Sequence, residues 1–478
     1  MKTERKQFYR DVLENLQSQS LAVFAGAGLS KAAGFVDWKG LLRDIADDLG
    51  LSIDQENDLI SIAQYNENKV GGRSMLNQKI ISEFNEDVDL TENHKILARL
   101  PISTYWTTNY DDLIERSLKE AKRVADVKHS VSQLSFSRPR RDVVVYKMHG
   151  DSTLPNEATL TKDDYERYFS DKAPFVTALS GDLVSKLFVF IGFSFTDPNL
   201  DYIFSRVKFY MKGADRHHYY FIKKAEKNDP DIKTDADLEY KRRKQELFIQ
   251  DLRRFKLQPI FIDTYAEITE ILREIENLYK KRTVFIGGSA EEYGVWDRNQ
   301  AQTFIHKLSA RLIKENFRIV NGFGWGVGSA VINGALEMIY SRPEKYGEDQ
   351  LIIKPFPQFK TGNKELVELW TEYRNNMIQY AGAAIFLFGN KLNNEKDKII
   401  PASGLIQEFE IAKSKQLFLL PIASTGYVSQ ELYKDLARND YYLSFNNLKE
   451  LIAELEVETN ADQIIELIIK VLNSLNQK

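Results

Sequence analysis

Short apolar segments alternate with helix-like segments along almost the whole chain, and this alternation constrains the fold more than any other feature of the sequence. In the first half, the strand-like runs are residues 21–25, 104–107, 143–148, 188–192, 219–222 and 259–262. Strands that are each followed by a helix pair in parallel, because a parallel connection has to cross the sheet. The sequence therefore predicts the α/β class, with open and mostly parallel sheets.

A boundary between two domains is expected near residue 280. The helical pattern of residues 267–279 ends in Lys280, Lys281 and Arg282, and basic side chains are favourable at a helix C-terminus. A new strand, glycine turn and helix begin at residue 283. Further strands are expected at residues 318–321, 351–354, 384–388 and 417–421. We therefore predict two Rossmann-like, open parallel-sheet domains in tandem, residues 1–280 and 281–478.

Charge and cysteine content narrow the possible functions. The 65 basic and 69 acidic residues nearly cancel, so there is no global attraction to nucleic acid or anionic lipid, and we interpret the basic run 138–141 as a loop. No apolar run approaches the ~20 residues that cross a bilayer, and the charged N-terminal segment is unlike a signal peptide, so we expect a cytoplasmic location. The chain has no cysteine, which excludes disulfides, a thiolate nucleophile and cysteine-ligated zinc; we expect no metal.

Four polar segments each follow an expected strand of the first domain. Because the carboxyl ends of parallel strands share one edge, these segments should meet where open α/β sheets bind ligands. A glycine turn alone is as often a plain tight turn as a phosphate site, but four such segments predict a nucleotide cleft. The candidate residues are Ala25, Gly26, Ala27, Gly28 and Ser30 in a glycine turn, then Asn109 and Asp111, then His149, and finally Gly192, Ser194 and Asp197.

Asn109 and His149 are the candidate catalytic residues. The neutral amide of asparagine is no useful base, but it can orient a water or a sugar hydroxyl by donating and accepting hydrogen bonds together. Histidine can accept a proton near neutral pH. A lone histidine more often has a structural role, and the surrounding motifs are what favour catalysis here.

The motifs GAGxS, TxNYD, HGD and GxSxxD, in this order, resemble the sirtuin (Sir2-type) NAD-binding fold over roughly residues 10–275. The resemblance implies that the glycine turn embraces the NAD⁺ pyrophosphate, that Asn109 lies at the nicotinamide ribose and that His149 is the catalytic base. It also implies that Gly192, Ser194 and Asp197 lie toward the adenosine side. Sirtuin deacetylases generally carry a four-cysteine zinc module, which this chain cannot build. Water then becomes the natural acceptor, and the implied reaction is NAD⁺ hydrolysis to nicotinamide and ADP-ribose.

The second domain has its own candidate site for a phosphate-bearing ligand. Its glycine-rich loop follows the strand 318–321, and alternating glycines can expose successive backbone amides to an anion, although a flexible turn would look the same. Arginine offers a forked pair of donors and lysine a point charge. These segments resemble the SLOG family, Rossmann-like domains that sense or process nucleotides. The candidate residues are Ser289, Gly324, Gly326, Gly328, Arg374, Lys391 and Glu408.

A sirtuin-like domain followed by a SLOG domain resembles the effectors of the bacterial Thoeris antiphage system. The resemblance implies that a partner enzyme with a TIR domain makes a cyclic ADP-ribose isomer, which the SLOG domain binds. Arg374 and Lys391 would meet its pyrophosphate, and Glu408 a ribose hydroxyl. Binding would activate NAD⁺ cleavage allosterically, within a homotetramer or a higher assembly, and end in abortive infection. The alternatives are an NAD-dependent protein deacylase and a non-catalytic nucleotide sensor.

Overall fold

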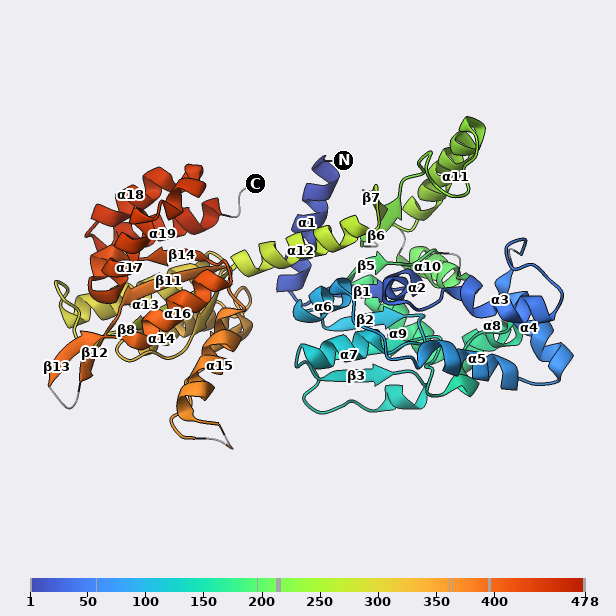
Figure 1. Ribbon diagram of the computed structural model, residues 1–478, viewed down its shortest axis with the longest axis horizontal. Helices are drawn as coiled ribbons and strands as arrows, with labels where there is room; N and C mark the ends of the chain where they lie inside the picture. The colour runs from blue at the N-terminus through green and yellow to red at the C-terminus, as the bar shows by residue number, and fades with distance from the viewer. Residues whose placement is uncertain are drawn as a thin grey trace. The chain divides into compact units, whose positions relative to one another are not determined.

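The computed structural model describes residues 2–56, 58–195, 197–211, 216–360, 362, 364–393 and 397–475. The chain divides into two compact units, Met1–Glu276 and Asn277–Lys478, called here the N-terminal and C-terminal units. Helix α12 (Ala266–Lys281) crosses the boundary between them (Figure 1). Thr196, which belongs to the fourth predicted motif, lies outside the described residues.

The N-terminal unit contains a seven-stranded parallel sheet in the order β3-β4-β2-β1-β5-β6-β7. The chain leaves β1 toward β2 on one side and later returns to β5 on the other, so β1 marks the switch point at which open sheets bind ligands. The predicted α/β class with open parallel sheets is confirmed. The strands are β1 Leu21–Ala25, β2 Thr104–Thr107, β3 Ala125–Lys128, β4 Val143–Lys147, β5 Leu187–Ile191, β6 His218–Lys223 and β7 Leu257–Ile262.

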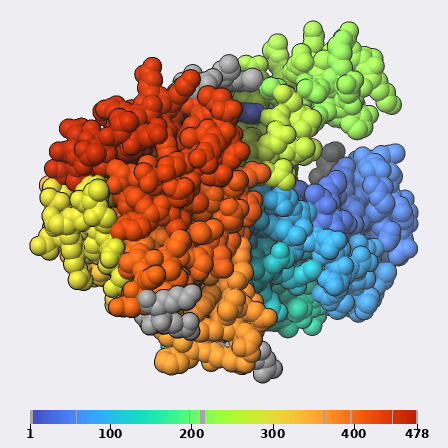
Figure 2. Space-filling model, turned by 60° about the vertical axis from the view of Figure 1, so that its left-hand side comes forward, coloured from blue at the N-terminus to red at the C-terminus, as the bar shows by residue number. Residues whose placement is uncertain are grey.

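Helices fill the connections of this sheet. Among the helices between β1 and β2, α3 to α5 contribute Leu42, Ile62 and Ile80 to a separate small core, which residues such as Leu113 and Leu160 complete. Helix α11 projects from the unit, as its light green ribbon and surface show (Figure 1, Figure 2). The helices are α1 Lys2–Gln17, α2 Ala27–Ser30, α3 Trp38–Asp48, α4 Leu59–Val70, α5 Ser74–Phe84, α6 Glu92–Arg99, α7 Leu113–Glu120, α8 Lys162–Asp171, α9 Ala173–Ser185, α10 Pro198–Met211 and α11 Asp235–Arg253.

The C-terminal unit contains a five-stranded parallel sheet, β10-β9-β8-β11-β14, and a separate antiparallel pair, β12 and β13. One hydrophobic core runs through it. Its strands are β8 Thr283–Ser289, β9 Arg318–Asn321, β10 Leu351–Ile353, β11 Ala383–Phe388, β12 Asn390–Asn393, β13 Lys398–Pro401 and β14 Phe418–Pro421. Its helices are α13 Arg298–Lys314, α14 Gly328–Ser341, α15 Leu366–Ile378, α16 Ser403–Ser414, α17 Tyr427–Arg438, α18 Lys449–Val457 and α19 Ala461–Ser474. Among the described residues, no helix is both long and apolar enough to span a membrane.

Candidate active site and candidate nucleotide site

The glycine turn after β1 packs directly against the loop after β5. The backbone N–H of Gly26 donates to the Ile191 carbonyl, and that of Gly28 donates to the Gly192 carbonyl, each at 2.9 Å. A Cβ atom on Gly26 would lie 2.5 Å from the Gly192 oxygen, and one on Gly192 would lie 2.2 Å from the Leu29 nitrogen. In this structure these glycines therefore permit a backbone contact that joins two of the four predicted segments.

Asn109 connects the loop after β2 to the same glycine turn. Its side-chain Nδ2 donates to the Gly26 carbonyl at 3.1 Å and to Ser30 Oγ at 3.0 Å. Its backbone N–H donates to Thr107 Oγ1 at 2.9 Å, and Asn109 itself is buried. Both side-chain donors are thus engaged, so the carboxamide oxygen is the group that could address a sugar hydroxyl or a water.

Lys147, at the end of β4, contacts both the loop that carries Asn109 and the loop that carries His149. It was not predicted as a site residue. Its side chain is fully buried, and Nζ donates to the backbone carbonyls of Tyr110 at 3.2 Å and Asp111 at 2.6 Å. It also forms an ion pair with Asp151 and lies 3.2 Å from Glu115 Oε1. In the sequence, Lys147 only ends the mostly apolar run 143–147, and nothing in that run indicates that its ammonium group is buried.

Burial and charge set opposing pKa shifts in this cluster. Burial would lower the pKa of Lys147, but the carboxylates of Glu115 and Asp151 outweigh it and raise that pKa. Burial raises the pKa of Asp111 and Glu115 despite the nearby ammonium. Burial would also raise the pKa of Asp151, but the contact with Lys147 lowers it. The lysine is therefore charged and Asp151 is its ionised partner.

His149 meets Asp197, a residue that the sequence placed toward the adenosine side of the cleft. His149 Nε2 lies 3.1 Å from Asp197 Oδ2, and the two side chains are 1% and 9% exposed. The ring of His149 also packs edge-on against Tyr165 and Tyr168 of α8, with centroids 5.7 and 6.1 Å apart. The loops after β4 and β5 thus supply one buried pair.

Two other predicted residues lie close by along the chain. Ala27 begins the short helix α2, and Ser194 is exposed in the loop between β5 and α10. Within the described residues, no group of three or more histidine, aspartate or glutamate side chains is arranged to hold a metal ion.

In the C-terminal unit, the structure brings Arg374 of α15 and Glu408 of α16 together. Arg374 Nε lies 3.8 Å from Glu408 Oε1, and one terminal N–H of the guanidinium donates to Gln407 Oε1 at 2.9 Å. Arg374 Nε is buried and has no hydrogen-bond partner among the described residues. Burial raises the pKa of Glu408 to about 7, with Arg374 acting in the opposite direction. A buried donor without a partner beside such a carboxyl suits a ligand that supplies acceptors.

The other predicted residues of this unit surround the start of α16 and the end of β8. Lys391 Nζ donates to Ser403 Oγ at 3.4 Å, and Ser289 Oγ donates to the Asn390 carbonyl at 3.0 Å. Asn390, which sequence reasoning did not single out, is buried and accepts the backbone N–H groups of Glu291 and Glu292. Asn390 therefore holds the loop after β8 in place. The sequence could not show this role, because the two segments lie about a hundred residues apart.

The glycine-rich loop packs tightly against β8 and the residues after it. A Cβ on Gly324 would lie 1.9 Å from the Gly288 oxygen, and one on Gly326 would lie 1.9 Å from the Ala290 oxygen. The backbone N–H of Gly328 donates to the Gly324 carbonyl at 2.7 Å, so this amide is engaged within the loop. Close packing thus accounts for these glycines in the structure.

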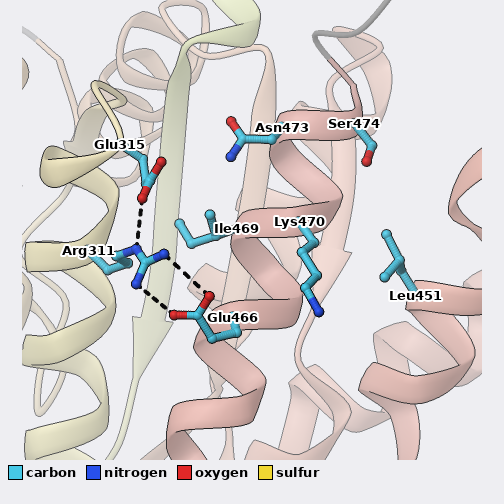
Figure 3. Close-up of a pocket in the computed structure, with 8 residues that line it drawn as sticks. All are labelled: Arg311, Glu315, Leu451, Glu466, Ile469, Lys470, Asn473 and Ser474. Carbon is cyan, nitrogen blue, oxygen red and sulfur yellow. Dashed lines mark hydrogen bonds and ion pairs between the residues drawn. The ribbon is translucent and has the colours of Figure 1, made fainter.

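An open groove lies elsewhere on the C-terminal unit, over α13, α18 and α19 (Figure 3). Arg311 in this groove donates from Nε to Glu315 and from both terminal nitrogens to Glu466, so each guanidinium nitrogen has an acceptor. None of the predicted site residues lines the groove.

The fold and these two loop clusters define a class of protein, and comparison with known families agrees. The SIR2-like domain family matches residues 103–246, and the Sir2- and TIR-associating SLOG family matches residues 267–475. The protein is thus a SIR2-like domain followed by a SLOG domain.

Proteins that resemble the chain along its full length identify the family. The chain is 48% identical over 475 residues to the NAD(+) hydrolase ThsA of Bacillus cereus (strain MSX-D12), covering 98% of each chain. It is 45% identical over 486 residues to the NAD(+) hydrolase ThsA of Cytobacillus dafuensis, covering 99% of this chain and 97% of the relative. It is 43% identical over 473 residues to that of Acinetobacter baumannii (strain 532279), covering 98% of each. The chain belongs to the ThsA family.

Proposed function

We propose that this protein hydrolyses NAD⁺ at the bond between nicotinamide and ribose, releasing nicotinamide and ADP-ribose. The observation that carries the proposal is the placement of Asn109 and His149 on loops that follow adjacent parallel strands, where Thr107 of β2 pairs with Lys147 of β4. Full-length relatives named NAD(+) hydrolase support it.

Each side chain has a role that follows from its chemistry. Loss of nicotinamide leaves positive charge on the ribose, so the site has to hold the ribose and deliver a nucleophile. The oxygen of the Asn109 carboxamide orients the water or a ribose hydroxyl, and His149 accepts its proton. We assign the turn from Ala25 to Ser30 to the pyrophosphate, and Gly192 and Ser194 to the adenosine side.

The C-terminal unit is proposed to bind the signal that switches this activity on. The ligand is a cyclic ADP-ribose isomer made by a partner enzyme with a TIR domain, and NAD⁺ depletion then stops phage growth. Arg374 and Lys391 would contact its pyrophosphate and Glu408 a ribose hydroxyl, with Ser289 and the glycine-rich loop beside them. The buried, unpartnered Arg374 Nε supports this assignment. By the family resemblance, the active form is a homotetramer or a higher assembly.

Nicotinamide release from NAD⁺, measured with and without cyclic ADP-ribose isomers, tests the hydrolase. We expect His149→Ala to lower the rate by at least about 10²-fold, as for loss of a general base. His306→Ala is the matched control, because His306 lies on α13 and pairs with Glu337 at 2.9 Å. The proposal fails if no condition yields nicotinamide or if His149→Ala matches the wild type. Release that requires an acetyl-lysine peptide would identify a deacylase.

A further inference from the structure

We propose that Asp197 is a positioning residue for His149: its carboxylate holds ring Nε2, which leaves Nδ1 as the nitrogen that exchanges the proton. This inference rests on the NAD⁺ hydrolysis proposed above and assigns the geometry of its base. It also gives Asp197 a role other than binding NAD⁺.

The contact is built by the strand order. In the sheet, β2 and β1 lie between β4, which precedes His149, and β5, which precedes Asp197. The loop after β5 packs on the glycine turn through Gly192 and brings Asp197 Oδ2 to 3.1 Å from His149 Nε2. The contact between His149 and Asp197 therefore reaches across the carboxyl ends of β2 and β1, and it depends on the order of four strands in the sheet.

The Asp197 carboxylate is fixed in place and ionised. Its Oδ1 accepts the backbone N–H groups of Asn199 at 2.8 Å and Leu200 at 3.4 Å at the start of α10. Oδ2 is the oxygen on the imidazole side, 3.1 Å from His149 Nε2, and it also accepts the Tyr165 hydroxyl at 3.5 Å. Burial would raise the pKa of Asp197, but His149 and the two backbone donors together lower it. A fixed carboxylate beside Nε2 favours the tautomer with the proton on Nε2.

The remaining ring nitrogen is ready to act on a bound molecule. Both nitrogens of His149 are buried and neither has an aligned hydrogen bond to a described residue. A buried nitrogen without a partner is costly, so a bound molecule is the natural source of one, and catalytic contacts often straighten only when substrate is present. With Nε2 facing Asp197, Nδ1 carries the lone pair that accepts a proton from the nucleophile.

Asp197→Asn tests this role, because the amide oxygen can still cap α10 while the negative charge is lost. We expect kcat for NAD⁺ cleavage, at saturating cyclic ADP-ribose isomer, to fall about 10²–10³-fold with KM changed by less than about threefold. A residue that only positions the base acts on the chemical step, so the split between kcat and KM distinguishes this role from a contact with bound NAD⁺. The other titratable groups packed on the ring are Tyr165 and Tyr168, both from α8.

Asp201→Asn is the matched control: Asp201 is an exposed residue of the same helix and should leave kcat unchanged. Asp197→Ser, which also caps a helix, repeats the test if the amide variant folds poorly. A kcat within threefold of wild type in Asp197→Asn overturns the inference and leaves the hydrolase standing. So does a loss of kcat that comes with an equal rise in KM. Wild-type protein that never cleaves NAD⁺ overturns the hydrolase itself.

Discussion

Lys147 contacts two backbone carbonyls and two carboxylates of the N-terminal site. Replacing it by methionine keeps the length of the side chain but leaves Asp111, Glu115 and Asp151 without their cation. Breaking a buried ion pair by removing one partner typically costs ~3–5 kcal/mol, so Lys147→Met should lower the melting temperature by several degrees and abolish NAD⁺ cleavage. Thermal unfolding followed by circular dichroism measures the first effect.

Lys227→Met serves as the control for that experiment. Lys227 pairs with Asp235 at 2.7 Å, but both side chains are mostly exposed, and exposed pairs contribute little to stability. Its melting temperature should stay at the wild-type value. An equally stable Lys147→Met protein would show that the buried carboxylates do not need the ammonium.

At the residue scale, the sequence could place the candidate side chains at strand ends but could not predict which residues they contact. Asn109 and His149 stand out because a polar motif follows a strand-like run. The contact of Asp197 with His149 and the burial of Lys147 depend on which strands become neighbours in the sheet. That order is set by packing between distant segments, so no local pattern around Asp197 or Lys147 carries it.

At the scale of elements, the contact between the α2 turn and the loop after β5 gives a sharp prediction. Gly192 has φ of +67°, and a Cβ there would meet the Leu29 nitrogen at 2.2 Å. Gly192→Ala should therefore displace the glycine turn, with a loss of stability well beyond the ~1–2 kcal/mol of a left-handed alanine and a loss of NAD⁺ cleavage. Nicotinamide release and the melting temperature check both effects.

Gly50→Ala separates the cost of a left-handed backbone from the cost of a steric clash. Gly50 has φ of +75°, and a Cβ there would meet no atom of the described residues within 4 Å. It should show only the backbone cost and keep its activity. If Gly192→Ala behaved like Gly50→Ala, the close approach of the two loops would have no importance for the site.

Strands β3, β12 and β13 were not predicted from the sequence, and each lacks the buried apolar pattern that identifies a strand. The buried positions of β3 are Asp126 and Lys128, which pair with each other at 2.8 Å, so the buried face of this edge strand is charged and not apolar. The short pair β12 and β13 is mostly exposed. Helix α11 begins at Asp235, where Thr234 and Asp237 form a capping box. The fully buried strands, such as β1 and β5, were predicted to within a residue.

At the scale of the whole molecule, the activation proposed above would link ligand binding in one unit to catalysis in the other by a coupling free energy. Such a ligand acts only through its preference for the active arrangement, so a variant that weakens binding should shift the activator concentration needed and leave the chemistry of the cleft unchanged. The residues of the two sites are therefore separable by kinetics: His149 and Asp197 should act on kcat, and Arg374 on the activator response.

Arg374→Ala tests this separation. A charged hydrogen bond contributes ~1.5–3 kcal/mol, so the concentration of cyclic ADP-ribose isomer for half-maximal activation should rise about 10–100-fold. The unit should still fold, because burial already raises the pKa of Glu408 to about 7 and the carboxyl can become neutral once the guanidinium is gone. Arg311→Ala, an arginine of the separate groove, is the control and should respond to the activator like wild type (Figure 3). Normal activation of Arg374→Ala at limiting activator would show that the signal binds elsewhere.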